Sequence, residues 1–286
     1  MAPVLTRHTV NGVILLGDDA RPGGVTFAFT ERTGGVSRPP YASLNLGSRC
    51  GDDAAAVAEN RRRALRALGA GDIAANLVEP RQVHGDHVVC VRGGACVARQ
   101  AADVSRPALR PAPATPEEVE RARAEAQAGA DAVVCTAAGV PVLLCFADCV
   151  PVVITAPGAF AVIHSGWRGT IARICATSLS ALCDEAGCDP KDVQAYVGPH
   201  IGGEDYEVSQ ELLDRFVGEF GTMVAVKGMS RHLSLTNAVV STLVDAGVGP
   251  SQVAVVREST SSHTDRFFSY RAEDGTTGRH AAIAYL

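Results

Sequence analysis

Cysteine, histidine and arginine side chains lie close together in one apolar stretch of the chain, residues 145–170, CFADCVPVVITAPGAFAVIHSGWRGT. The runs 150–155 and 160–163 are rich in β-branched and aromatic residues, and the Ala-Pro-Gly-Ala segment between them is typical of a turn. This pattern predicts a β-hairpin. The hairpin would carry the reactive side chains at its ends into a small volume.

The register of this hairpin brings a thiol and an imidazole together. If the turn centres on Pro157 and Gly158, His164 lies opposite Pro151, and Cys149 is its diagonal neighbour on the same face. Diagonal neighbours are roughly 7–8 Å apart at Cα, so a cysteine thiolate and a histidine could share one metal ion.

An arginine and the predicted start of a helix follow His164. Arg168 precedes Thr170, and apolar residues recur after it at helical spacing, so Thr170 is predicted to be the N-cap. A helix N-terminus favours negative charge, and Arg168 adds a positive one. We therefore expect an anion-binding corner beside the metal site.

Other polar residues could join this site. Arg32 lies in a glycine-bearing loop, where a solvent-exposed arginine of a tight turn is the more common case, and His200 lies in a glycine-proline loop that could line a pocket. His84 and His87 lie in a predicted strand over 82–89. Because residues at i and i+3 of a strand point to opposite faces, at most one of these two histidines would join a given site, and a single strand histidine is commonly structural.

Composition limits the classes of protein that the chain can represent. It has 286 residues, 47% of them hydrophobic, and a net charge of −5, which suits one large globular domain. Its pI of about 5.9 and the lack of a basic-aromatic stripe argue against nucleic acid as the main partner. The longest apolar stretch is broken by a turn and is too short to cross a bilayer, and no signal peptide is evident, so we expect a cytoplasmic protein.

The nine cysteines are odd in number and form no Cys-x-x-Cys pair, so no disulfide framework is expected. Strand-like and helix-like segments alternate irregularly along the chain, which favours a mixed α/β architecture over a doubly wound sheet. Residues 94–129 are rich in Ala, Arg, Pro and Glu, with a polar helix over 117–128. They lack the apolar content to fold alone and are predicted to be a surface insertion within a single domain, 1–286.

Several motifs occur together in one known family. They are Arg32-x-Gly34-Gly35-Val36-Ser37, Gln82-Val83-His84-Gly85, Ala147-Asp148-Cys149-x-Pro151, His164-Ser165-Gly166-Trp167-Arg168-Gly169-Thr170, Gly198-Pro199-x-Ile201, Tyr206-Glu207-Val208 and Phe267-Phe268-Ser269-Tyr270-Arg271. In this order the chain resembles the YfiH/LACC1 family, formerly called multicopper polyphenol oxidoreductase laccases. The resemblance covers nearly the whole chain, and the histidine-tryptophan-arginine and Ala-Asp-Cys motifs are its most specific parts.

The resemblance implies a fold, a metal and an activity. The fold is an α+β, single-domain, layered α-β-β-α sandwich with mixed sheets, and the metal is zinc held by His84, Cys149 and His164, which are also the catalytic residues. The activity is that of a purine nucleoside phosphorylase acting on adenosine, inosine and methylthioadenosine, with adenosine deamination beside it. Arg32, Gln82, Arg168 and His200 are expected to bind the nucleoside or phosphate, and the protein to be a monomer or small homo-oligomer.

The chain departs from the family pattern near its C-terminus. Ser259 stands where the family has cysteine, and Ala272 where it has a second arginine. The metal ligands are unaffected, but substrate preference could change.

Other functions are compatible with the same residues. Two histidines and one cysteine leave a fourth zinc position for water, so a zinc amidase acting on peptidoglycan precursors is one alternative. A copper-dependent polyphenol oxidase is another, although the eight histidines form no His-x-His pair and copper would bind such a site adventitiously. A binding protein that zinc merely stabilises would unfold on chelation, whereas a core of this size should survive metal loss.

Overall fold

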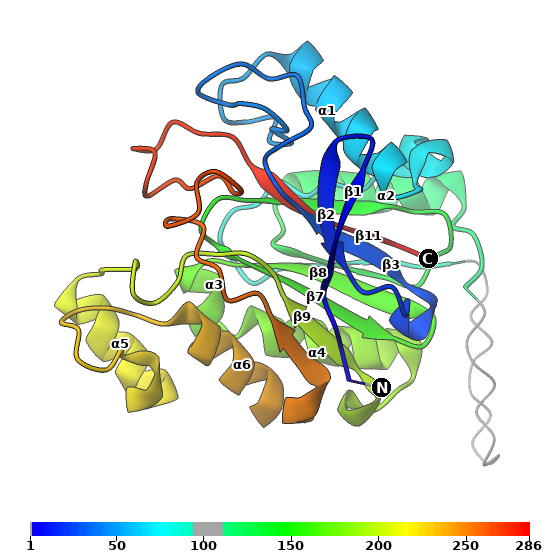
Figure 1. Ribbon diagram of the computed structural model, residues 1–286. Coiled ribbons are helices and arrows are strands. Elements are labelled where there is room, and N and C mark those ends of the chain that lie inside the picture. Colours follow the sequence, from blue (N-terminus) through cyan, green and yellow to red (C-terminus); the bar gives the residue numbers. More distant parts are fainter. Residues whose placement is uncertain (1, 94–110) are drawn as a thin grey trace, which may run out of the picture.

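Two β-sheets stack face to face between two layers of helices in the computed structural model, which describes residues 2–93 and 111–286 (Figure 1). The five-stranded sheet has the order β1-β2-β3-β11-β6, with bounds Thr6–Val10, Val13–Gly17, Thr26–Thr30, His280–Tyr285 and Val142–Phe146. The six-stranded sheet has the order β10-β9-β7-β8-β5-β4, with bounds Val253–Val255, Gln194–Val197, Val150–Ala156, Ala159–Ser165, Ala132–Cys135 and Val88–Val91. In the second sheet β10 and β4 run parallel to their neighbours and the other pairs are antiparallel, so it is mixed.

Four of the six α-helices in the described residues begin at a residue whose side chain caps the first turn. They are α1 (Ala54–Ala67), α2 (Pro116–Ala128), α3 (Trp167–Ile171), α4 (Ile174–Ala186), α5 (Gln210–Phe220) and α6 (Leu235–Asp245), with short 3-10 turns at Pro22–Gly24, Gly71–Asn76, Pro190–Asp192, Thr222–Val224 and Pro250–Gln252. Side chains of Asp53, Thr115, Ser209 and Ser234 accept first-turn N–H groups of α1, α2, α5 and α6.

Three apolar layers hold the sandwich together. Between the sheets, side chains such as Phe27, Phe29, Leu144 and Phe160 are buried. The other face of the six-stranded sheet packs against α4, α5 and α6, and that of the five-stranded sheet against α1. The predicted layered α-β-β-α fold is confirmed.

The hairpin β7–β8 forms with the predicted register. Ala156 pairs with Ala159 across a two-residue turn at Pro157 and Gly158, and Pro151 lies opposite His164. Both strands are buried along their whole length. On β8, Phe160 and Val162 face the other sheet, and the period of two puts His164 on that same side.

Two local predictions are wrong. Thr170 is not an N-cap: α3 begins at Trp167 with Gly166 as its cap, and α4 begins only after Arg173, which has a φ of 56°. Thr170 is buried inside α3, where its hydroxyl donates back to the Gly166 carbonyl at 2.9 Å.

The predicted strand over 82–89 is also wrong in its first part, because β4 begins at Val88. His84 lies in the preceding loop with a φ of 60°. His84 and His87 therefore do not lie on opposite faces of one strand, as had been expected.

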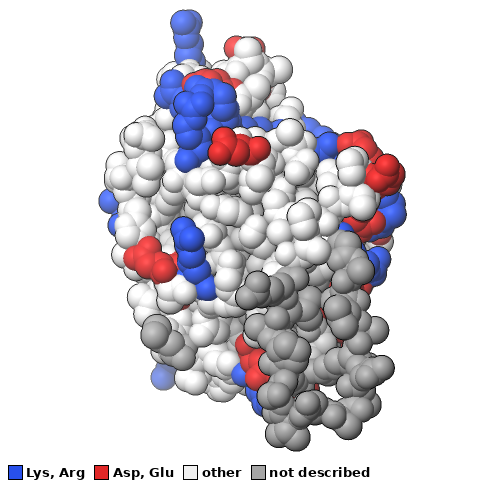
Figure 2. All heavy atoms as spheres, turned by 90° about the vertical axis from the view of Figure 1, so that its right-hand side faces the viewer, with Lys and Arg blue, Asp and Glu red and all other residues white. Residues whose placement is uncertain are grey.

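The predicted insertion at about 94–129 lies partly outside the described residues. Helix α2 confirms the helix predicted over 117–128 and buries Val119, Ala122 and Ala126 in the layer between the sheets. On the face drawn in Figure 2, acidic and basic side chains are mixed along the edges and a broad uncharged area lies between them. Within the described residues, no helix has the length and apolar character needed to cross a membrane.

Candidate metal centre and its surroundings

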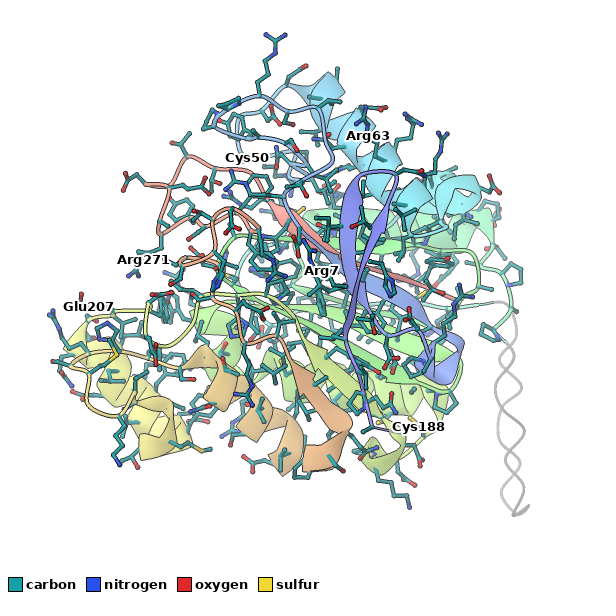
Figure 3. The ribbon with its side chains drawn as sticks, in the orientation of Figure 1. Arg7, Cys50, Arg63, Cys188, Glu207 and Arg271 are labelled. Atoms are coloured by element: carbon teal, nitrogen blue, oxygen red, sulfur yellow. The ribbon has the colours of Figure 1, made fainter. Side chains whose placement is uncertain are left out.

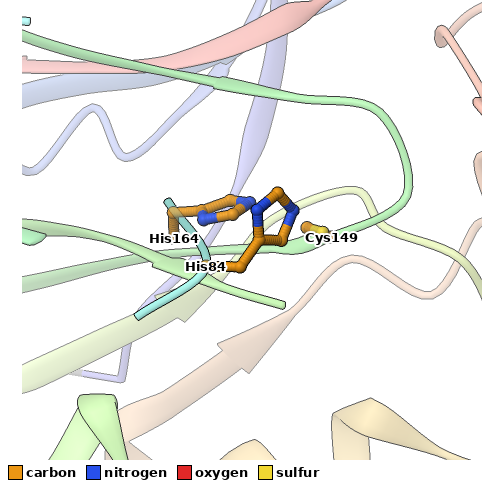
Figure 4. A group of neighbouring side chains, drawn as sticks. All are labelled: His84, Cys149 and His164. Atoms are coloured by element: carbon orange, nitrogen blue, oxygen red, sulfur yellow. The ribbon is translucent and has the colours of Figure 1, made fainter. Parts of the chain in front are cut away.

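Three side chains from separate segments meet at one end of the β7–β8 hairpin (Figure 4). Cys149 directly precedes β7, His164 is the penultimate residue of β8, and His84 lies in the loop before β4. One potential ligand atom from each lies within 4.8 Å of the others. The two imidazole rings stand edge to face, with centroids 4.8 Å apart and planes at 80°. The structure thus brings together the three residues predicted to bind metal.

Asp131 orients both histidines. Its carboxylate is fully buried and lies 2.7 Å from Nδ1 of His164. The same carboxylate accepts the backbone N–H groups of Val83, His84 and Gly85 at 3.1, 2.9 and 2.7 Å. Because a carboxylate can only accept here, His164 carries its proton on Nδ1 and presents Nε2, the arrangement common behind metal-binding histidines.

The ionisation of Asp131 supports this assignment. Burial alone would raise its pKa, but the hydrogen bond and charge of His164 and the backbone N–H groups outweigh burial and lower the pKa below the usual value. Asp131 is therefore a carboxylate at neutral pH.

Gly166 leaves the space that an ion at this place requires. A Cβ at Gly166 would lie 2.9 Å from Cδ2 of His84 and 3.2 Å from Sγ of Cys149. The group is thus a cradle of two imidazoles and one thiol that any larger residue at position 166 would crowd. Such a donor set suits zinc or copper.

The electrostatics favour a thiolate at Cys149. Burial would raise the pKa of its thiol, but the charges and hydrogen bonds of His164 and His84 lower the pKa to about 6. Burial would lower the pKa of His164, but Cys149 and Asp131 raise it to about 9. Since the thiolate is the form that binds metal, the site is prepared for a cation.

Asp148, next to Cys149, ties three loops to the site. It has a φ of 84°, which L-residues rarely adopt. Its carboxylate accepts the Thr260 hydroxyl at 2.6 Å and the Arg271 N–H at 2.7 Å, and its carbonyl accepts the Ile201 N–H at 3.0 Å. These bonds fix the backbone on either side of the thiol.

Arg32 and Gln82 are engaged by protein groups. Arg32 donates to the Ala42, Thr264 and Phe267 carbonyls and to Glu273. The Gln82 side-chain amide donates to and accepts from the backbone of Cys145 at 2.8 and 2.9 Å, so it joins the loop before β4 to β6. Their expected contact with substrate stays a prediction.

Arg168 and His200 differ in exposure. Arg168 is exposed and its guanidinium lies 4.6 Å from the centroid of the Trp167 ring. His200 is buried, with its ring nitrogens 2.8 Å from the Gly198 carbonyl and 2.7 Å from the Thr236 hydroxyl. Burial lowers the pKa of His200, so it is a neutral ring at pH 7. Their roles in binding also stay predictions.

Asp131 was not predicted from the sequence to take part in the site, and Asp148 and Tyr206 were named only as members of family motifs. An aspartate directly before an apolar strand was a signal for Asp131, because a buried carboxylate needs partners. The Ser259 hydroxyl accepts the Gly202 N–H at 2.9 Å, and Ser259 forms a β-bridge with His200.

A family comparison matches most of the chain. Residues 26–286 match the model described as multi-copper polyphenol oxidoreductase laccase. Among curated proteins, the chain is 35% identical over 266 residues to a purine nucleoside phosphorylase of Deinococcus radiodurans, covering 92% of this chain and 89% of that one. It is 30% identical over 274 residues to the purine nucleoside phosphorylase YfiH of Escherichia coli, covering 93% and 96%.

Solved structures share the fold. YlmD of Geobacillus stearothermophilus superposes with a TM-score of 0.80 at 29% identity over 99% of this chain and 98% of that chain. The Bacillus licheniformis hypothetical protein YfiH gives a TM-score of 0.79 at 28% identity over 95% and 96%.

Proposed function

Because the chain belongs to the YfiH/LACC1 family, the one described as multi-copper polyphenol oxidoreductase laccases, we propose that it is a zinc-dependent purine nucleoside phosphorylase. Relatives of 30 and 35% identity carry the name purine nucleoside phosphorylase, which supports the class of reaction. The observation that carries the proposal is the His84, Cys149 and His164 group, with its ligand atoms within 4.8 Å of one another. Adenosine, inosine and methylthioadenosine are the proposed substrates, and adenosine deamination the proposed side reaction.

This donor set suits a catalytic zinc ion better than a redox-active metal. Two imidazoles and one thiolate leave a tetrahedral position open, as in catalytic rather than structural zinc sites. A zinc ion held there would supply Lewis-acid polarisation. His164 is oriented for it by Asp131, and Cys149 is held as a thiolate by the neighbouring imidazoles.

Phosphorolysis demands that a phosphate oxygen reach the ribose carbon that carries the base. The carbon–nitrogen glycosidic bond breaks, a carbon–oxygen bond forms, and the departing base takes a proton. Holding phosphate and nucleoside together is therefore the main task of the protein. Arg168, Arg32, Gln82 and His200 are the proposed side chains for this binding, and Arg168 is the one whose guanidinium is exposed.

The test is to incubate zinc-loaded protein with adenosine, with and without phosphate, and to follow adenine, ribose 1-phosphate and inosine by chromatography. The Cys149→Ala variant is the control. Phosphate-dependent adenine release that this variant abolishes supports the proposal. If no nucleoside is turned over, the proposal fails, and release of an amino acid from peptidoglycan amides would identify an amidase instead.

A further inference from the structure

The backbone of Arg271 is hydrogen-bonded to Asp148, the residue before Cys149. Its N–H donates to Oδ2 of Asp148 at 2.7 Å, and Asp148 is the residue before Cys149. The Thr260 hydroxyl holds the other oxygen of that carboxylate at 2.6 Å. Arg271 is thus fixed next to the proposed metal ligands although it lies far away in the sequence.

The guanidinium of Arg271 is exposed and carries an uncompensated charge. Its Cζ lies 5.3 Å from the centroid of the Tyr206 ring, and its Nη1 donates to the Glu207 carbonyl at 3.1 Å. Figure 3 labels Arg271 and Glu207, which lie on the same side of the molecule. Among residues 2–93 and 111–286, no carboxylate forms an ion pair with it. Arg32, in contrast, already pairs with Glu273 and donates to three backbone carbonyls. Most donors of Arg271 are therefore open to a ligand.

Tyr206 connects Arg271 to the site. Its loop is tied to the residue before Cys149, because the Ile201 N–H donates to the Asp148 carbonyl at 3.0 Å and the Tyr206 N–H donates to the Gly203 carbonyl at 3.3 Å. The Tyr206 ring is half-buried, and in the described part of the chain no protein group hydrogen-bonds to its hydroxyl. A hydroxyl and a guanidinium with open donors thus adjoin next to the segment that carries Cys149.

We propose that Arg271, stacked on Tyr206, forms an oxyanion-binding subsite beside Cys149 that holds inorganic phosphate. A planar guanidinium matches phosphate with two parallel hydrogen bonds, and the ring beneath it limits the orientations that it can adopt. The Tyr206 hydroxyl is a further donor to the same anion. This inference rests on the proposed phosphorylase function, for which it adds Arg271 to Arg168 as a side chain that binds inorganic phosphate.

The experiment compares Arg271→Met with the wild type and with Arg231→Met. Arg231 is the matched control because it is also exposed and its guanidinium bonds to the side chain of Glu207. The KM for phosphate and the KM for inosine are measured separately for the zinc-loaded enzymes. For Arg271→Met we expect the phosphate KM to rise roughly tenfold or more and the inosine KM to change less than about twofold. Arg231→Met should keep both values.

A second measurement records thermal stability and needs no enzymatic turnover. The rise in Tm caused by inorganic phosphate is recorded for the same three proteins, and we expect it to be lost in Arg271→Met alone. Should Arg271→Met fold poorly, Arg271→Gln, which keeps side-chain hydrogen bonding without the charge, takes its place in both measurements.

An unchanged phosphate KM with an unchanged Tm response, or an equal rise of both KM values, would overturn the subsite. If the wild type cleaves nucleosides without phosphate, or not at all, the phosphorylase proposal fails separately. The Tm response then still decides whether Arg271 binds the anion.

Discussion

Asp131 and His164 form a buried pair in which the carboxylate lies 2.7 Å from Nδ1 of the imidazole. The same carboxylate accepts the backbone N–H of His84 at 2.9 Å and those of its two neighbours. One acidic side chain thus orients a ring on β8 and a loop before β4. The metal cradle depends on this residue, although it contributes no ligand.

Replacing Asp131 with Asn should weaken zinc binding about tenfold to hundredfold. The amide cannot accept on both of its ends, so either the His164 ring or the loop around His84 loses its partner. Zinc affinity is measured by competition with a chromophoric chelator. Asp214→Asn, an exposed change on α5 at a carboxylate that accepts from Gln210, is the control. Equal affinity in Asp131→Asn and wild type would contradict the role given to Asp131.

The cradle should not tolerate a methyl group at position 166. In Gly166→Ala the added Cβ would lie 2.9 Å from the His84 ring and 3.2 Å from the Cys149 sulfur, so we expect zinc binding to fall more than fold stability does. Gly218→Ala on α5 is the matched control, because its Cβ meets no atom within 4 Å. That change should stabilise the protein by about 0.5–1 kcal/mol and leave zinc binding intact. Full zinc binding by Gly166→Ala would argue against this site.

Among the cysteines in residues 2–93 and 111–286, Cys149 should be the most reactive one of the metal-free protein near neutral pH. Its pKa is lowered to about 6, whereas burial raises the pKa of Cys135 and Cys175 to about 12. Alkylation of Cys149 by iodoacetamide, followed by mass spectrometry, should therefore rise with pH around a midpoint near 6. His164→Asn should move that midpoint up toward about 8.5, and zinc should protect the thiol. A midpoint near 8.5 in the unaltered protein would show that the imidazoles do not stabilise the thiolate.

A buried ion cluster at Glu31 should make the fold sensitive to acid. Glu31 is 1% exposed and bonds to Arg7 and Arg266. Burial would raise its pKa, but the hydrogen bonds and charges of these arginines lower it. Because the native pKa is below the unfolded value of about 4.3, the stabilisation is complete above that pH. It is lost as the pH falls through the native pKa.

Glu31→Gln should lower the free energy of unfolding by about 2 kcal/mol at pH 7, because it leaves two arginines without their buried partner. The loss should shrink as the pH falls below about 4. Urea unfolding at several pH values measures both effects. Glu59→Gln, which removes a partly exposed partner of Arg62 and Arg63, should change stability little. A Glu31→Gln protein as stable as wild type at pH 7 would refute this reading of the cluster.

The hairpin could be predicted from sequence because its determinants are local. A two-residue turn and a side-chain period of two fix the pairing of Pro151 with His164, and thereby the place of Cys149. The predictions that His84 joins the site and that the fold is layered came from the resemblance of the motifs to a known family. The element that carries His84 was predicted incorrectly, because the loop conformation depends on Asp131, some 47 positions away in the chain.

Contacts that depend on chain folding could not be predicted in this way. Arg271 reaches Asp148 over 123 positions, and neither residue lies in a local pattern that points to the other. Arg32 and Gln82 looked equally available for substrate in the sequence, yet their partners come from distant loops and strands. Whether a polar side chain is free or engaged is decided by packing rather than by spacing.

The most direct test of the central claim is to follow the phosphorus atom. Zinc-loaded protein is incubated with inosine and isotopically labelled inorganic phosphate, and labelled ribose phosphate and hypoxanthine are quantified together. We predict one labelled ribose phosphate for each hypoxanthine released, and neither product with Cys149→Ala. Hypoxanthine release with all label left in free phosphate, or full activity in Cys149→Ala, would contradict phosphorolysis at the His84, Cys149 and His164 site.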